Sequence, residues 1–150
     1  DQLVSETMAW LGEDPKGSLL DLFCGSGAFT LPAEAKGYSV LGLDSQPGKG
    51  PFQKVNLRKG VPKALLKKSW QTVITDPPRA GMDKSLCLQI REQIRPQRLF
   101  YISCNPATLA RDLKYICANN TYQIKRVKGF DLFPQTTHVE TLVELERSGL

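Results

Sequence analysis

The chain has 150 residues, of which 41% are hydrophobic and 23% are charged, with a formal net charge of +5. These values predict one globular domain over residues 1–150, and they exclude a membrane-spanning chain because no apolar run approaches ~20 residues. The four cysteines lack the short spacings of zinc ligands and only one histidine is present, so we expect no metal site and no disulfide framework, and the positive charge suits a nucleic acid.

The first third of the chain alternates helices with apolar strands. Apolar spacing predicts an amphipathic helix over residues 3–11. Near-continuous apolar runs over residues 18–23 and 39–44 are typical of strands that are buried on both faces of a parallel sheet. Between them, a glycine-containing turn leads into a helix over residues 28–35, which Gly37 ends.

The middle of the chain gives a weaker pattern, because residues 45–59 are rich in Gly, Pro and Lys. We expect a short strand over residues 52–57 and a short helix over residues 63–70. The basic side chains of this stretch either contact RNA or form a solvated helix face, and both interpretations stay open. A clear strand follows over residues 72–76, and a helix follows over residues 84–94.

The last third begins with an apolar strand over residues 99–103 and a helix over residues 107–118. Two further strands, over residues 122–133 and 138–146, are joined by a turn at residues 134–137. They indicate an antiparallel hairpin at the end of an otherwise parallel sheet. This alternation of strands and helices predicts a doubly wound α/β fold with a mostly parallel sheet.

A small-molecule site is indicated where the first strand ends. Gly25 and Gly27 let the backbone approach a ligand closely, and Asp44 ends the second strand at the spacing of a ribose-binding acid. The third glycine of the dinucleotide fingerprint is missing, and the Asp21 carboxylate suits a cationic amine and sulfonium better than a pyrophosphate. We therefore assign Asp21, Gly25 and Gly27 to the methionine part of S-adenosylmethionine and Asp44 to its ribose, and we expect Cys24 to pack.

A second site is indicated at the ends of the strands over residues 72–76 and 99–103. The motif from Asp76 to Arg79 lacks the terminal aromatic residue of amino-methyltransferases and the Pro-Cys nucleophile of DNA cytosine-5 methyltransferases. Cys104 lies on the turn from the second of these strands into a helix, an edge where α/β sheets bind ligands. On position alone, a small packed hydrophobe is the slightly favoured role of Cys104, and a nucleophile is the alternative.

Carbon methylation of a pyrimidine would give Cys104 a role. C5 becomes nucleophilic only after a thiolate adds to C6, and a base must then remove the C5 proton. Glu140 is the candidate base, although a surface glutamate is the simpler explanation of that residue alone. The Asp76 carboxylate is suited to accept a hydrogen bond from the N3–H of uracil.

Four segments, in the same order along the chain, resemble the RNA uracil-5-methyltransferase family. They are DLFCGSGAFTLP (21–32), DPPRAG (76–81), SCNPATLARD (103–112) and DLFPQTTHVE (131–140). The resemblance implies a Rossmann-like S-adenosylmethionine-dependent methyltransferase fold, with a seven-stranded sheet whose last strand is antiparallel. It also implies that Cys104 is the nucleophile, Glu140 the base, and Asp76 and Arg79 the substrate contacts. The residues expected to contact the cofactor are Asp21, Phe23, Gly25, Gly27, Asp44, Asn56 and Asp76.

The family makes 5-methyluridine in structured RNA, so the resemblance implies a cytoplasmic RNA-modifying enzyme. We expect 23S rRNA as the substrate, with tRNA as the alternative. The chain departs from the family at Asn56, where an acid usually follows the third strand; the amide is expected to bind the adenine amino group. We expect residues 1–150 to hold the catalytic domain without the family's upstream RNA-binding and central domains, so a cofactor-binding fragment that is inactive alone is a second hypothesis. A cytosine-5 RNA methyltransferase is a weaker third one.

Overall fold

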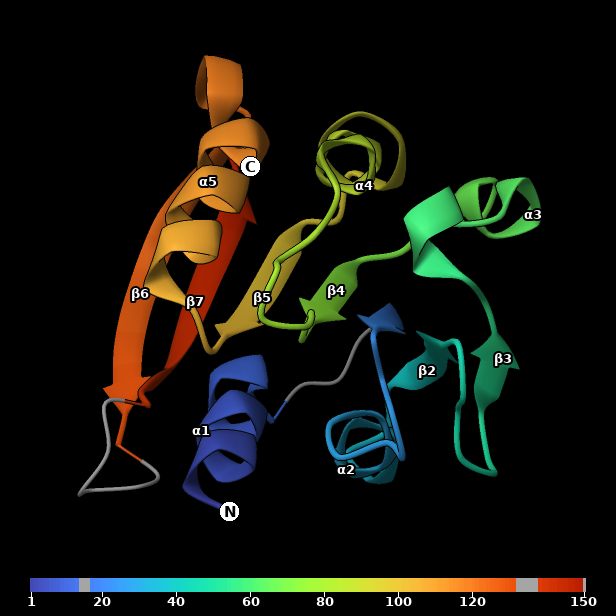
Figure 1. Ribbon diagram of the computed structural model, residues 1–150. Coiled ribbons are helices and arrows are strands. Elements are labelled where there is room, and N and C mark those ends of the chain that lie inside the picture. Colours follow the sequence, from blue (N-terminus) through green and yellow to red (C-terminus); the bar gives the residue numbers. More distant parts are fainter. Residues whose placement is uncertain (14–16, 132–137, 150) are drawn as a thin grey trace.

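The computed structural model describes residues 1–13, 17–131 and 138–149, and its seven strands form one twisted sheet between two layers of helices (Figure 1). The strands are β1 (Ser18–Leu22), β2 (Ser39–Asp44), β3 (Phe52–Lys54), β4 (Thr72–Thr75), β5 (Arg98–Ser103), β6 (Tyr122–Phe130) and β7 (Glu140–Arg147). The helices are α1 (Gln2–Leu11), α2 (Thr30–Ala35), α3 (Lys63–Leu66), α4 (Lys84–Gln89) and α5 (Pro106–Ile116). No helix among the described residues is long and apolar enough to cross a membrane.

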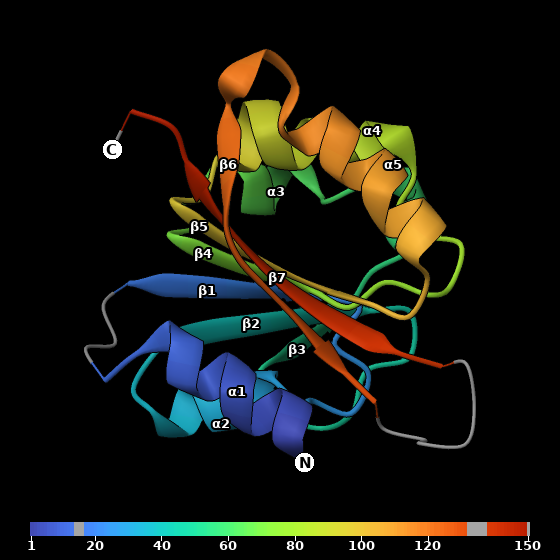
Figure 2. The same cartoon turned by 90° about the vertical axis from the view of Figure 1, so that its left-hand side faces the viewer.

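The sheet has the strand order β3-β2-β1-β4-β5-β7-β6. β1 to β5 all run parallel to one another, whereas β7 runs antiparallel to both of its neighbours, β5 and β6. α1 and α2 cover one face, and α3, α4 and α5 cover the other (Figure 2). The expected doubly wound α/β fold, with a mostly parallel seven-stranded sheet and an antiparallel last strand, is confirmed.

The core lies on both faces of the sheet because successive strand side chains point to opposite sides. Leu19 and Phe100 belong to the apolar cluster under α1 and α2. Leu20 and Leu99 belong to the cluster under α3, α4 and α5. Two covered faces explain why these strands read as continuous apolar runs rather than as alternating ones.

Several expected bounds differ from the structure. The third strand ends at Lys54, because the Asn56 side chain accepts the Arg58 N–H and starts a 3₁₀ turn over Leu57–Lys59. The helix expected over residues 63–70 ends at Leu66. α4 ends at Gln89 and continues as a π-helical turn over Ile90–Ile94. The turn expected at residues 134–137 lies outside the described residues.

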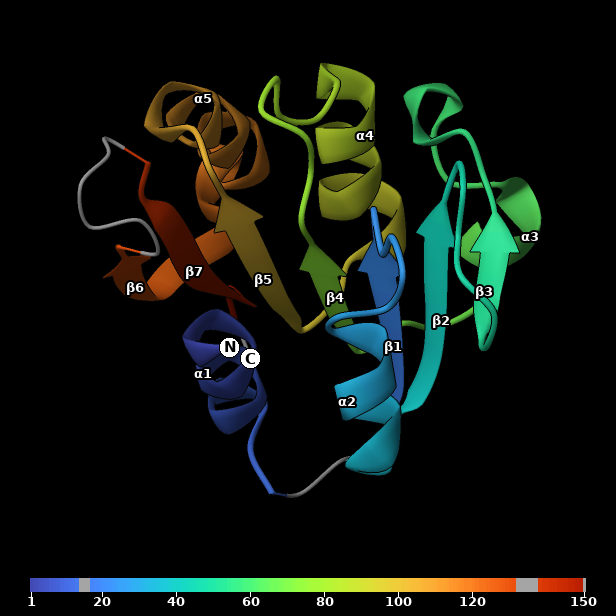
Figure 3. The same cartoon turned by 60° about the horizontal axis from the view of Figure 1, so that its bottom comes forward.

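One edge of the sheet collects the residues that the sequence marks for function. The carboxyl ends of β1, β2, β4 and β5 all point to this edge (Figure 3). Because β7 is antiparallel, its first residue, Glu140, lies there too, and Thr141 pairs with Ser103 at the end of β5. The topology therefore brings the ends of five strands together.

Candidate active site

The turn after β1 is built from residues with left-handed backbone geometry. Phe23, Gly25 and Gly27 have φ values of 61°, 54° and 97°. A Cβ atom on Gly27 would lie 2.6 Å from the ring of Phe52, so the turn needs glycine there for space as well as for conformation. The Gly25 N–H donates a hydrogen bond of 3.0 Å to Asp44. The turn is thereby fixed against the end of β2.

Asp44 is held by backbone groups on both sides. Its Oδ2 accepts from Gly25, and its Oδ1 accepts from the Gln46 N–H at 3.0 Å. The side chain is half-buried and lines a cleft of about 500 Å³. Its remaining lone pairs can accept hydroxyl donors from a ligand.

Asp21 is not on the wall of this cleft, contrary to the expectation of a direct ligand contact. β1 carries its side chain to the face under α2, where it is fully buried. One carboxylate oxygen accepts a hydrogen bond from the hydroxyl of Thr30, and the other has no hydrogen-bond partner among the described residues. Burial, which outweighs the lowering effect of the Thr30 hydrogen bond and acts together with the charges of Asp76 and Asp44, raises the pKa of Asp21 to about 7. Asp21 therefore lies behind the glycine turn, within electrostatic reach of the cleft.

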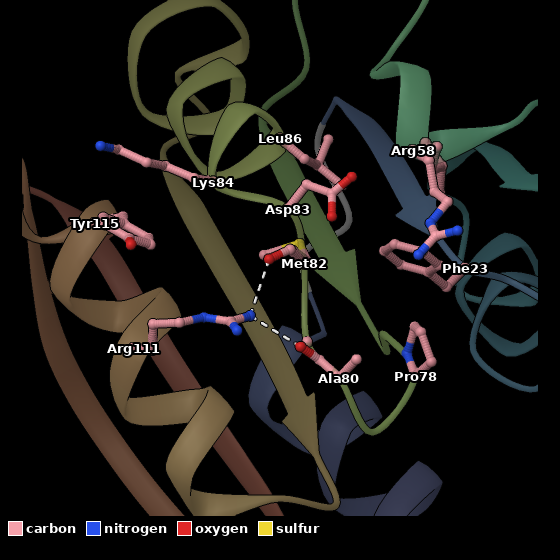
Figure 4. Close-up of a pocket in the computed structure, with 12 residues that line it drawn as sticks. Phe23, Arg58, Pro78, Ala80, Met82, Asp83, Lys84, Leu86, Arg111 and Tyr115 are labelled. Carbon is pink, nitrogen blue, oxygen red and sulfur yellow. Dashed lines mark hydrogen bonds between the residues drawn. The ribbon is translucent and has the colours of Figure 1, made fainter.

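The cleft runs along the ends of β1, β2, β3 and β4. It is lined by Phe23, Asp44, Ser45, Val55, Asn56, Leu57, Arg58, Asp76 and Pro78. A second hollow of about 380 Å³ shares Phe23, Leu57, Arg58 and Pro78 and extends toward α4 and α5 (Figure 4). Sequence reasoning missed Leu57 and Arg58 as lining residues, although both follow Asn56 directly, whereas Pro78 belongs to the Asp76–Arg79 motif that the sequence marks.

Asp76, after β4, and Glu140, at the start of β7, lie at the same edge of the sheet on either side of β5, and their charges interact. Asp76 follows the last residue of β4 and is half-buried. Burial raises the pKa of Asp76 to about 7, with a further contribution from the Glu140 charge. Burial also raises the pKa of Glu140. Two carboxyls that share a partly dehydrated site favour protonation of one of them near neutral pH.

Cys104 lies on a turn that is fixed by its neighbours. The Ser103 hydroxyl donates to the Asn105 carbonyl at 2.9 Å and accepts from the Asn105 N–H at 3.0 Å. The Asn105 side chain then caps α5 by accepting the Ala107 N–H, with Pro106 at the first helical position. The thiol is half-buried at the sheet edge, next to the strand that starts with Glu140.

The other strand-end thiol has a different environment. Cys24 is buried, and burial together with the charges of Asp21 and Asp44 raises the pKa of its thiol to about 12. Its sulfur would collide with a Cβ on Gly42, which shows how tightly it packs against β2. The expectation that Cys24 packs is confirmed.

Arg79 reaches the Cys104 turn through its backbone. Its carbonyl accepts hydrogen bonds from the Asn105 side-chain amide at 3.2 Å and from the Thr108 hydroxyl at 3.0 Å. The residue is exposed. The loop after β4 is therefore attached to the start of α5, while a substrate contact by the Arg79 guanidinium stays a prediction.

A protein-family model described as tRNA (Uracil-5-)-methyltransferase matches residues 50–148, which contain Asp76, Cys104 and Glu140. The chain belongs to this family. The match to the tRNA (uracil-5-)-methyltransferase family model begins at residue 50, after the glycine turn. That turn falls instead within the longer alignments to individual relatives, one of which covers 97% of the chain.

Curated relatives extend the similarity over nearly the whole chain. The 23S rRNA (uracil(1939)-C(5))-methyltransferase RlmD of Marinomonas sp. (strain MWYL1) is 36% identical over 161 residues, which cover 97% of this chain and 36% of the relative. The protein of the same name from Klebsiella pneumoniae (strain 342) is 37% identical and covers 97% and 37%. This uracil-5-methyltransferase family chain thus spans about a third of the length of these relatives.

Solved structures are similar to this chain in fold. The tRNA (uracil-54, C5)-methyltransferase of Pyrococcus abyssi, in complex with S-adenosyl-L-homocysteine, has a TM-score of 0.77 and 30% identity, covering 96% of this chain and 37% of that one. The magnesium protoporphyrin IX methyltransferase of Synechocystis PCC 6803, with bound SAM, has a TM-score of 0.70 at 19% identity, with 98% and 79% covered. The second similarity concerns the fold alone.

Proposed function

We propose that residues 1–150 form the catalytic domain of an enzyme that transfers a methyl group from S-adenosylmethionine to C5 of a uridine in RNA. The observation that carries the proposal is the convergence of Cys104, Asp76 and Glu140 from three adjacent strand ends, beside a cleft that also holds Asp44. A thiol, a base and an acceptor for a pyrimidine N–H are the groups that this chemistry requires.

The cleft fits S-adenosylmethionine by its donor set. Asp44 offers carboxylate oxygens for ribose hydroxyls. Asp76 and the buried Asp21 suit a sulfonium and an ammonium group, because a nearby cation favours the ionised form of both carboxyls, whose pKa values are otherwise raised. The side-chain Oδ1 of Asn56 caps the 3₁₀ turn, so its side-chain NH₂ is the group best placed for the adenosine part. The Phe23 ring supplies apolar surface between the cleft and the second hollow. When bound, this cofactor supplies an electrophilic methyl group.

In the proposed mechanism, Asp76 in its ionised form accepts the N3–H of uracil and orients the ring. The Cys104 thiolate adds to C6, and the electron pair of the C5–C6 double bond moves onto C5 and the adjoining carbonyl. After C5 has gained the methyl group, Glu140 removes the C5 proton. The electron pair of that C–H bond restores the double bond and expels the thiolate, so Cys104 is regenerated.

The substrate that we propose first is 23S rRNA, because the RlmD proteins are 36–37% identical to this chain. tRNA is the alternative, since the Pyrococcus abyssi protein is named for tRNA. The target base must be unstacked from the RNA to reach the half-buried Cys104. We place the enzyme in the cytoplasm, where a reactive thiol stays reduced.

The test is to incubate the chain with labelled S-adenosylmethionine and either 23S rRNA or tRNA transcripts, digest the RNA and identify the methylated nucleoside by mass spectrometry. We expect 5-methyluridine, and a preference between the two RNAs identifies the substrate. Formation of 5-methylcytidine instead would favour the cytosine-5 alternative.

A second candidate function is cofactor binding without catalysis, which the short coverage of the relatives favours. Titration calorimetry with S-adenosylmethionine, together with RNA binding at low salt, separates the two. Cofactor binding without RNA binding supports the fragment, because phosphate contacts are strongest at low salt.

A further inference from the structure

Asp112 is a fully buried carboxylate on α5 that receives donors from three parts of the chain. Its Oδ2 accepts from the Met82 N–H at 2.8 Å and from the Tyr101 hydroxyl at 2.5 Å. Its Oδ1 accepts from Nε and Nη2 of Arg111 at 3.1 and 3.0 Å. The carboxylate therefore joins β5, α5 and the loop after β4, which comprises residues 77–83.

Arg111 adds two further contacts to the same loop. Its Nη2 donates to the carbonyls of Ala80 at 2.9 Å and Met82 at 3.1 Å (Figure 4). The side chain is 45% exposed, so its guanidinium lies across the loop surface rather than in the core. The planar fork of arginine suits this pattern, because it can bond a carboxylate and backbone carbonyls at once.

The loop rests directly on α5 at Gly81. The φ of Gly81 is 77°, and a Cβ there would lie 2.7 Å from Arg111, 2.8 Å from Asp112 and 3.1 Å from Thr108. Together with the Asn105 and Thr108 bonds to the Arg79 carbonyl, four residues of the α5 segment hold one loop by its backbone.

We propose that Arg111 and Asp112 are positioning residues, which hold loop 77–83 on α5 so that Asp76 and Cys104 keep a fixed relative position during methyl transfer. The inference rests on the proposed function. Asp76 immediately precedes the loop, and Cys104 immediately precedes the α5 segment that holds it. Apolar contacts of α4 and α5 already attach these helices to the sheet. Outside their own pair, Arg111 and Asp112 bond the backbone of one loop, and Asp112 also bonds the Tyr101 hydroxyl and the Cys87 thiol of α4.

A shift of about 1 Å in the position of a reacting group can lower a rate by about 100-fold without a comparable loss of binding. Loosening the loop is therefore expected to lower kcat more than it raises KM. Residues that only support folding would instead lower the yield of folded enzyme and leave the kcat of the folded fraction unchanged.

The experiment compares Arg111→Met with Lys114→Met, a matched control on the same helix. Lys114 is exposed and carries the same charge, so both variants lose one cation that RNA could feel. Single-turnover methyl transfer at saturating RNA and cofactor gives the rate, calorimetry gives the cofactor Kd, and hydrogen exchange follows the Met82 amide.

We expect Arg111→Met to lower the rate by about 10- to 100-fold with a cofactor Kd within about threefold of the wild type, and to speed exchange at Met82. Lys114→Met is expected to change neither the rate nor the exchange. Tyr101→Phe removes one donor without removing a charge, and it should lower the rate by a few-fold in a chain that still folds.

Equal rates in the two methionine variants, or unchanged exchange at Met82 in Arg111→Met, would overturn the inference. Failure of the wild-type chain to methylate RNA is a different outcome. It contradicts the proposed function, and with it the role of Arg111 and Asp112 in methyl transfer as positioning residues, while the exchange data still show whether they hold the loop.

Discussion

Replacing Glu140 with glutamine tests most directly whether Glu140 is the base and Cys104 the nucleophile. The substitution keeps the shape of the side chain but removes the proton acceptor, so the thiolate adds, the methyl group transfers and the C5 proton stays. Loss of a positioned general base lowers turnover by about 100- to 10,000-fold. Because Cys104 leaves only when that proton is removed, the covalent link between Cys104 and the RNA should accumulate.

The structure adds a second consequence of this substitution. The Glu140 charge contributes to the raised pKa of Asp76, but burial contributes more. In Glu140→Gln the pKa of Asp76 should therefore fall below about 7 and remain above the 3.8 of an ordinary aspartate. The rate of adduct formation by Glu140→Gln should therefore begin to fall only at a lower pH than the rate of methyl transfer by the wild type.

The assay is denaturing gel electrophoresis of the protein with labelled RNA and cofactor. Glu146→Gln is the matched control, since it removes the same charge from the opposite end of β7, where Glu146 pairs with Lys125. We expect an RNA–protein band in Glu140→Gln and little in the control. Turnover of Glu140→Gln within about threefold of the wild type would refute the assignment of Glu140 as the base.

Three other predictions follow from the same geometry. Cys104→Ala should abolish methyl transfer, whereas Cys24→Ala should retain it, and intact-mass analysis after iodoacetamide treatment should show alkylation of Cys104 before the buried Cys24. The kcat/KM for uridine methylation should rise with pH through about 7, because only ionised Asp76 accepts the N3–H of uracil; a flat profile would contradict that role. Asp44→Ala should weaken cofactor binding about tenfold or more in calorimetry and leave RNA binding at low salt unchanged, because a ligand hydrogen bond to a charged group is worth ~1.5–3 kcal/mol.

Strand positions and strand ends could be predicted from the sequence because they depend on local patterns. Continuous apolar runs gave β1, β2, β4 and β5, and the residues that follow them gave Asp76 and Cys104. Short elements were less predictable. Asn56 ends β3 by capping a turn, and the spacing of apolar residues does not indicate where such a cap ends a strand.

Asp21 shows what strand periodicity leaves out. Alternation places it on the same face of β1 as Leu19, but the pattern does not say that α2 covers that face at this level. The Thr30 hydroxyl nine residues later is the partner that makes burial of the carboxylate tolerable. From the sequence alone, a carboxylate in a buried strand with a threonine on the next helix fits two roles equally well. It can contact a ligand, or it can stabilise the glycine turn from behind.

Arg111 and Asp112 illustrate a different gap. Both lie within a segment whose resemblance to the family is specific, yet the sequence does not show what they contact in the loop after β4, because their partners there are backbone groups 29 to 31 residues earlier. A side chain that bonds a distant backbone leaves no residue type at the other end to recognise. Only the fold, which brings the loop after β4 onto α5, reveals the connection.

The reversed direction of β7 adds a different kind of residue position to this edge of the sheet. In a wholly parallel sheet, residues meet at the carboxyl edge only where strands end, so each contributes a side chain that follows a strand. β7 runs the other way, so Glu140 stands at its beginning and the rest of the strand anchors it between β5 and β6. The proposed base is thus carried by a strand paired on both sides, while Asp76 and Cys104 sit on the turns that follow β4 and β5. Because the proposed base is held by a strand, a productive geometry further requires that the two turns carrying Asp76 and Cys104 are fixed. The contacts of Asn105, Thr108, Arg111 and Asp112 fix them.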